Sequence, residues 1–211
     1  MDLNHAQTTL RSRDTRFLKR VFSPEEKDIL QADSQPEAML WALWTGKEAA
    51  YKVLQKERGE GIPSTPRLYS VQFTEESPPE SGSLPPFGER LFTGIVSTPA
   101  GKIFLSTLLA SKYVHTIATS SLPTADVVWE VERMPGEQPT PSEESAFVRA
   151  AAINYLARHL SVTPADLEII RHRGMHGLDP PRVYLHGQEA AVDISLSHDG
   201  AYAAYAFGLA L

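Results

Sequence analysis

The sequence predicts an α+β fold of two units, each a long helix packed on an antiparallel sheet. Two observations lead to this class. A long segment with helical periodicity is followed by several segments rich in β-branched and aromatic residues, and the same order begins again after a proline-rich stretch. We expect units at 1–135 and 140–211, related by a pseudo-twofold axis, with a linker at about 134–142. A chain of 211 residues can bury one large core or two small ones.

Three helices are predicted in the first unit and one in the second. A short basic helix covers 13–22, and a capping box of serine, proline and glutamate at 23–26 begins the next. A longer helix is expected from 36 to 58, where apolar residues recur at helical spacing, and the glycines and prolines of 59–66 end it. The helix of the second unit should cover 143–160.

The remaining apolar segments are typical of strands. Two pairs of them are similar in sequence, which indicates either a weak internal duplication or similar composition alone. If the duplication is real, the chain is a pseudo-dimer and a cleft between its halves is the natural ligand site. A loop rich in proline, serine and glycine is predicted at 77–88. The predicted strands are 68–73, 91–97, 103–109, 113–120, 127–132, 167–171, 182–185, 192–197 and 201–207.

The composition is that of an ordinary globular protein, with 42% hydrophobic and 22% charged residues. The net charge of −6 argues against nucleic-acid binding, which requires a basic face. The chain has no cysteine, which excludes disulfides, thiolate metal sites and a cysteine nucleophile. No apolar run approaches the roughly 20 residues of a membrane span, and the N-terminus has no signal-peptide core. We therefore expect a cytoplasmic protein with no membrane partner.

The segment 41–52, WALWTGKEAAYK, carries the first candidate site residues. Glu48 and Lys52 lie four residues apart and share a helix face. One interpretation is an exposed ion pair that stabilises the helix by a few tenths of a kcal/mol. The other is a ligand site, because neighbouring aromatic residues would desolvate the pair, and Gly46, which costs about 1 kcal/mol in mid-helix, indicates close approach by a backbone or a ligand. A glutamate beside Lys47 and Lys52 suits a site for Mg²⁺ and phosphate oxygens.

The segment 194–200, ISLSHDG, carries the second set. Strand alternation places Ser195 and Ser197 on one face and His198 on the other, unless the following turn redirects the histidine. Taken alone, the segment is best interpreted as a polar strand face that ends in a turn residue. The chain has no G-x-S-x-G elbow for a serine hydrolase, and its other histidines lack the spacing of a zinc site.

Four motifs follow one another along the chain. They are an early basic helix, RFLKRVFSPEE at 16–26; a W-x-x-K-E-A-x-x-K segment, WTGKEAAYK at 44–52; a G-x-P-like segment, GLDPPRVYL at 177–185; and a closing S-x-S-H segment, SLSHDGAYAAY at 195–205. In this order they resemble the 4'-phosphopantetheinyl transferase superfamily, in particular the holo-acyl-carrier-protein synthases. Larger members of that family join two units with the S-x-S-H half first, whereas the order here is reversed.

The resemblance implies transfer of the 4'-phosphopantetheine arm from coenzyme A to a serine of an acyl or peptidyl carrier protein, as in fatty acid or polyketide biosynthesis. By analogy, Glu48 would ligate Mg²⁺ and help to activate that serine, and Lys52 would bind the pyrophosphate. Ser197 and His198 would bind phosphates of coenzyme A, and Lys47 is placed with them among the cofactor-binding residues. Because two units share one chain, a monomer is expected.

The N-terminal segment departs from the family pattern. The family begins with a strand of the form G-x-D-I-x-E/D, and Asp2 matches the later acidic position rather than the metal-binding aspartate. This leaves three hypotheses: an active transferase, a degenerate member that binds coenzyme A or a carrier protein without transfer, and an unrelated α+β structural protein with coincidental motifs.

A cluster of basic residues near the N-terminus stands out in an acidic protein. Only Asp14 opposes it, and it is either a solvated helix face or a docking surface for an acidic carrier protein. The cluster consists of Arg11, Arg13, Arg16, Lys19 and Arg20.

Overall fold

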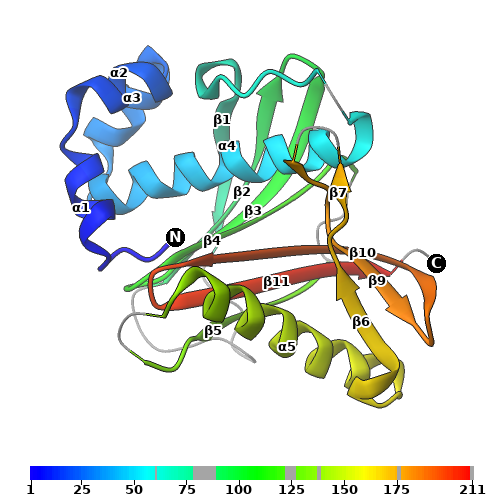
Figure 1. The fold of residues 1–211 in the computed structure, drawn as a ribbon. Helices are drawn as coiled ribbons and strands as arrows, with labels where there is room; N and C mark the ends of the chain where they lie inside the picture. Colours follow the sequence, from blue (N-terminus) through cyan, green and yellow to red (C-terminus); the bar gives the residue numbers. More distant parts are fainter. Residues whose placement is uncertain (60, 78–88, 122–126, 137–138, 175–176, 210–211) are drawn as a thin grey trace. The chain divides into compact units, whose positions relative to one another are not determined.

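The computed structural model describes residues 1–59, 61–77, 89–121, 127–136, 139–174 and 177–209. These residues divide into two units, Met1–Thr124 and Ala125–Leu211, and each contains a long helix and an antiparallel sheet (Figure 1). The predicted α+β class is therefore confirmed. Of the predicted loop 77–88, residues 78–88 lie outside the described part of the chain.

The first unit opens with helices α1 (Ala6–Ser12) and α2 (Thr15–Val21); α2 corresponds to the basic helix predicted at 13–22, whereas α1 was not predicted. Asp14 precedes α2, and its carboxylate accepts hydrogen bonds from the backbone N–H groups of Arg16 and Phe17 at 2.8 and 3.3 Å. Asp14 is thus the N-cap of α2. Helix α1 has a single buried residue and no side-chain cap, so its sequence carries little helical signal.

Helices α3 (Pro24–Ala32) and α4 (Pro36–Arg58) follow the predictions closely. Ser23 and Glu26 form the expected capping box, with hydrogen bonds of 3.2 and 2.9 Å between each side chain and the other residue's backbone N–H. Helix α4 has the predicted bounds and ends at Gly59, whose φ of +68° lies in the left-handed region that glycine adopts readily.

The sheet of the first unit has the antiparallel order β1-β2-β3-β4, and α4 packs on it. Its strands are β1 (Ser70–Ser77), β2 (Arg90–Thr98), β3 (Gly101–Leu109) and β4 (Val114–Thr119), preceded by a short 3-10 helix, η1 (Pro66–Leu68). Apolar residues of α2, α4 and all four strands contribute to the core, with Trp41 and Leu43 of α4 buried in it.

Gly94 of β2 lies opposite Phe73, where the register with β1 shifts. A Cβ atom there would lie 2.3 Å from the carbonyl oxygen of Gln72, which is backbone and has little freedom to move. We expect Gly94→Ala to lower the free energy of unfolding by about 1–3 kcal/mol, as overpacking does. Gly208→Ala is the matched strand control, because no atom lies within 4 Å of its added Cβ. Urea unfolding compares the two, and an equal effect at both positions would contradict the steric explanation.

The second unit begins with a strand that the sequence assigned to the first. Strand β5 (Val128–Arg133) pairs with β11 (Tyr202–Leu209), so it belongs to the five-stranded sheet β5-β11-β10-β9-β6. The division between the units therefore precedes the expected linker at 134–142. The start of that segment is part of the second unit, because Met134 is buried and its backbone N–H donates to the carbonyl of Ala201 at 2.8 Å.

Helix α5 (Pro141–Leu160) packs on this sheet and begins with a second capping box, formed by Thr140 and Glu143. Its buried residues form the core with apolar side chains of the sheet. The other elements of the unit are a 3-10 helix, η3 (Pro164–Asp166), and the strands β6 (Leu167–Ile170), β7 (Arg173–Gly174), β8 (Gly177–Leu178), β9 (Arg182–Leu185) and β10 (Gln188–Asp199).

Candidate functional site

Helix α4 presents Glu48 and Lys52 on its exposed side. The buried face of α4 turns toward the sheet, so residues four apart on the opposite side share one outward surface. The expected desolvation by neighbouring aromatic residues does not occur, because Trp41 points into the core while Glu48 and Lys52 are exposed. Each side chain is thus exposed while its backbone is held by a packed helix.

Lys47 lies on the inner side of α4, with an exposed fraction of 2%. Its ammonium is 2.7 Å from the carboxylate of Glu26, which is fully buried, and it donates to the carbonyl oxygens of Pro66 and Tyr69. This location differs from the expected contact with phosphate oxygens, because the ammonium is enclosed by protein groups. Burial lowers the pKa of Lys47, and this effect outweighs the opposing attraction of Glu26.

Gly46, where the sequence suggested close approach by another backbone or a ligand, is buried against side chains of the sheet. A Cβ atom there would lie 3.2 Å from the Cγ2 of Val71 and 3.3 Å from the Cδ2 of Leu105, two side chains of the sheet. The glycine therefore lets α4 approach the sheet closely. This close packing sets the height of Glu48 and Lys52 above the sheet.

The charge of Lys52 on this helix also affects the pKa of His115 in β4, a histidine for which the sequence predicted no role. Burial, together with the nearby positive charges of the amino terminus and Lys52, lowers the pKa of His115 to about 3. The imidazole is therefore neutral at physiological pH.

The S-x-S-H segment forms the end of β10 and the turn into β11. Ser197 pairs with Ala204 and His198 with Ala203, so the strand stays regular through the motif and the turn begins only at Gly200, whose φ is +57°. Ser197 and His198 consequently lie on opposite faces of β10. The histidine is on the face that α5 covers, together with the buried Ile194.

His198 has a partner that the sequence did not indicate. Its Nδ1 lies 2.9 Å from a carboxylate oxygen of Glu144, in the first turns of α5. The side chains are 34% and 17% exposed, respectively. Glu144 follows the capping glutamate of α5 and is 54 positions from His198, so no local pattern links the two residues.

The five basic residues are all exposed, on α1, on α2 and at the junction between them. Arg16, Lys19 and Arg20 share one face of α2, since they are three and four residues apart. Leu10 of α1, with 69% of its surface exposed, adds an apolar side chain next to Arg11. Exposed apolar and arginine side chains together are typical of protein-binding surfaces.

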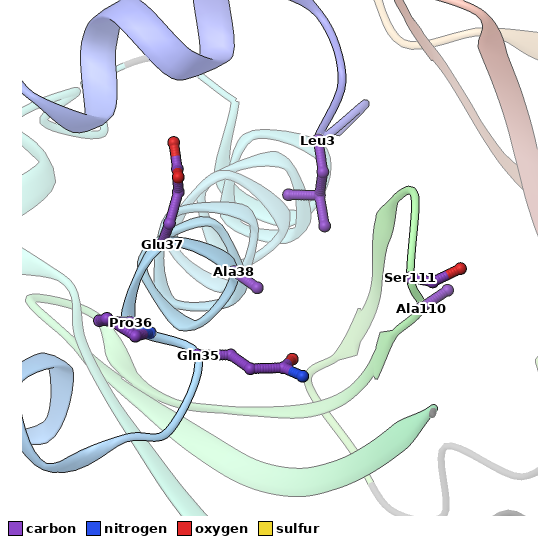
Figure 2. Close-up of a pocket in the computed structure, with 7 residues that line it drawn as sticks. All are labelled: Leu3, Gln35, Pro36, Glu37, Ala38, Ala110 and Ser111. Carbon is purple, nitrogen blue, oxygen red and sulfur yellow. The ribbon is translucent and has the colours of Figure 1, made fainter. Parts of the chain in front are cut away.

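A hollow of about 530 Å³ lies at the N-terminal end of α4 (Figure 2). Leu3, Ala38 and Ala110 contribute apolar surface to its lining, and the carboxylate of Glu37 accepts a hydrogen bond from the hydroxyl of Ser12 at 2.6 Å. Glu48 lies about 16 Å further along the helix axis, at 1.5 Å per residue. The hollow is therefore separate from the Glu48 and Lys52 surface. Its lining consists of Leu3, Gln35, Pro36, Glu37, Ala38, Ala110 and Ser111.

The donor chemistry of Glu48 fits a magnesium ion. Mg²⁺ keeps several waters in proteins and is held by one or two carboxylates together with substrate phosphates, and Glu48 supplies one exposed carboxylate. Asp2 is only 5% exposed, and its carboxylate accepts a hydrogen bond from the backbone of Asn4 at 2.9 Å. Within the described ranges, no group of three histidine or acidic residues forms a metal site of its own.

Comparison with known proteins decides the family. The family model of the 4'-phosphopantetheinyl transferase superfamily matches residues 1–118, more than half of the chain. The chain belongs to this superfamily. The match contains the basic cluster and the Glu48 helix, whereas Ser197 and His198 lie beyond it. Membership supports a transferase that acts on phosphopantetheine, with coenzyme A as substrate, and it excludes the hypothesis of coincidental motifs.

Two other comparisons found no counterpart. No curated protein and no solved structure matches the chain. In the described part of the chain, no helix has both the length and the apolar character needed to cross a membrane.

Proposed function

We propose that this protein transfers the 4'-phosphopantetheine arm of coenzyme A to a serine of an acyl or peptidyl carrier protein, in a reaction that requires Mg²⁺. The observation that carries the proposal is the exposure of Glu48 and Lys52 on one face of α4, within the segment that the family model matches. Phosphoryl transfer needs positioning and charge neutralisation, and these two side chains can supply both from a rigid helix.

In this reaction the serine oxygen forms a bond to the phosphorus that carries the pantetheine arm. The bond from that phosphorus to the bridging oxygen of the pyrophosphate breaks, so 3',5'-ADP leaves and the serine proton is released. Lys52 would bind the pyrophosphate oxygens with its ammonium. Glu48 would hold Mg²⁺, which neutralises phosphate charge when bound, and it would help to activate the serine hydroxyl. Ser197 and His198 would bind phosphates of coenzyme A.

One observation favours a second candidate, a member that binds coenzyme A or a carrier protein without transfer. Asp2, which matches the later acidic position of the family's first strand rather than the metal-binding aspartate, is buried and hydrogen-bonded to its own segment. In that case, of the residues that match the family pattern, Glu48 alone would supply a carboxylate to the metal.

Intact-protein mass spectrometry distinguishes the two. An apo carrier protein incubated with coenzyme A, Mg²⁺ and the wild-type chain should gain the mass of one phosphopantetheine group. Glu48→Gln should remove the gain, and Glu57→Gln, an exposed glutamate on the same helix, should retain it. Binding of coenzyme A without a mass gain would support the second candidate, and the absence of both would overturn the two candidates together.

Mg²⁺ and coenzyme A should bind cooperatively. Because Glu48 supplies one carboxylate and the remaining charge comes from the ligand phosphates, Mg²⁺ alone should bind weakly, and we expect coenzyme A to tighten its binding at least tenfold. Isothermal titration calorimetry with and without coenzyme A measures this coupling, and Glu48→Gln should reduce it. Tight Mg²⁺ binding to the free protein, or coenzyme A binding that ignores Mg²⁺, would refute the arrangement.

The basic cluster is proposed as the dock for the carrier protein. Complementary charge mainly accelerates association, and exposed charges are screened within about 8 Å at physiological ionic strength. Reversing Arg16 and Arg20 to glutamate should slow carrier association at least tenfold at low salt, as measured by stopped-flow, while the affinity for coenzyme A stays nearly unchanged.

The control for this reversal changes the net charge equally at a distance from α2. Arg58→Glu with Lys102→Glu, both exposed, should leave carrier association close to that of the wild type. If the Arg16 and Arg20 reversal weakens coenzyme A binding as well, the cluster belongs to the nucleotide site. If neither property changes, the cluster is a solvated helix surface only.

A further inference from the structure

The contact between Glu144 and His198 determines how the histidine can act. The carboxylate lies 2.9 Å from Nδ1, within hydrogen-bond distance, and it is the more buried of the two partners. Both residues belong to the second unit, one on α5 and one at the end of β10. The backbone of each is anchored, Glu144 by the capped first turn of α5 and His198 by its pairing with β11.

The surroundings add few other charges on this face of the sheet. The register places Ala203 of β11 opposite His198 and Glu132 of β5 beyond it. The carboxylate of Glu132 accepts a hydrogen bond from the hydroxyl of Tyr205 at 3.1 Å. From α5, the charged side chain that contacts the imidazole is Glu144.

The chemistry of the pair restricts the histidine. An ionised carboxylate can only accept hydrogen bonds, so Nδ1 must carry the proton that lies between the two side chains. A neutral imidazole has one N–H, and Nε2 is then an acceptor. A phosphate oxygen is also an acceptor, so it cannot bind at Nε2 until a second proton is added there.

We propose that Glu144 is a positioning residue that holds His198 in the Nδ1–H tautomer, so that His198 binds a phosphate of coenzyme A only after it takes up a proton. The inference rests on the proposed function of His198 as a phosphate ligand. The bound imidazolium donates Nδ1–H to Glu144 and Nε2–H to the phosphate oxygen. Glu144 thus makes coenzyme A binding proton-dependent without touching the ligand.

The tautomer can be measured without any ligand. Nitrogen-15 NMR of the His198 ring in the full-length protein should show the Nδ1–H form in the wild type. Glu144→Gln keeps the size of the side chain, but the amide can either donate a hydrogen bond to Nδ1 or accept one from it. The substitution should therefore allow the Nε2–H form to accumulate. The matched control is Glu143→Gln, which removes the same charge one residue away. The side-chain oxygen of the glutamine can still accept the hydrogen bond from the backbone N–H of Thr140 that caps α5.

Proton uptake is measured by titrating coenzyme A in buffers of different ionisation enthalpy between pH 7.5 and 8.5. In this range imidazoles are ordinarily neutral, and the second ionisation of a phosphate monoester, near pH 6, is complete. The wild type and Glu143→Gln should take up close to one proton, with affinity that falls up to about tenfold per pH unit. Glu144→Gln and His198→Gln should take up much less, with a correspondingly shallow pH dependence.

The results separate this inference from the function beneath it. An Nε2–H tautomer in the wild type, or equal proton uptake in the wild type and Glu144→Gln, would overturn the role of Glu144 even if transfer is active. If coenzyme A does not bind at all, the proposed function and the phosphate contact both fail, and the NMR tautomer still decides whether Glu144 positions the histidine.

Discussion

Lys47→Met should lower the free energy of unfolding of the first unit by about 3–5 kcal/mol, because it leaves the carboxylate of Glu26 buried without its cation. Glu26 is fully buried, and besides the ammonium it accepts hydrogen bonds from the backbone N–H groups of Ser23 and Val71, at 2.9 and 3.0 Å. The pair therefore connects α3, α4 and β1. Removing one charge exposes the full desolvation cost of the other.

Urea unfolding followed by tryptophan fluorescence measures the loss. The double variant Lys47→Met with Glu26→Gln should recover at least half of it, because glutamine keeps the capping box without a buried charge. Arg58→Met, an exposed cation on the same helix, should change the free energy of unfolding by less than about 1 kcal/mol. A loss below 1 kcal/mol for Lys47→Met would show that the buried pair contributes little to stability.

Lys52→Met should reduce the rate of phosphopantetheine transfer by about 10²–10³-fold, the usual effect of removing one group that stabilises charge in a transition state. The side chain is exposed on the outer face of α4, so its loss should leave stability nearly unchanged. This is the opposite behaviour to that of Lys47, which is only five positions away but lies inside the unit.

The rate is measured by mass spectrometry of the carrier protein under single-turnover conditions. Lys52→Arg should retain part of the activity because the charge remains, and Lys102→Met, an exposed lysine on β3, should behave as the wild type. A change of less than threefold in Lys52→Met would remove this residue from the proposed machinery and leave Glu48 as the remaining candidate on α4.

The elements that could be predicted are those that depend on patterns of a few neighbouring residues. The bounds of α4 agree with the prediction because apolar periodicity and the glycine that follows it define a helix locally. The capping box of Ser23 and Glu26 is also a local pattern, and the structure contains both of its hydrogen bonds. The start of α2 after Asp14 was missed by two residues, because an aspartate inside a run of basic residues can be either a surface charge or a cap, and α1 was not predicted at all.

Partners that are distant in sequence were not predictable. The membership of β5 in the second sheet follows from its hydrogen bonds to β11, about 70 positions later, and strand composition does not identify the neighbouring strand. For the same reason the motif K-E-A-x-x-K does not reveal which lysine is buried. Lys47 and Lys52 are chemically alike, and only the packing of α4 on its sheet encloses one and exposes the other.

The family, the helix that carries Glu48 and Lys52, and the strand that carries Ser197 follow from the order of residues along the chain, because periodicity, caps and motifs act over a few positions. The burial of Lys47 beside Glu26 and the contact of Glu144 with His198 required the folded chain. These contacts join residues 21 and 54 positions apart, and their formation depends on how helices and sheets pack, which no local pattern specifies.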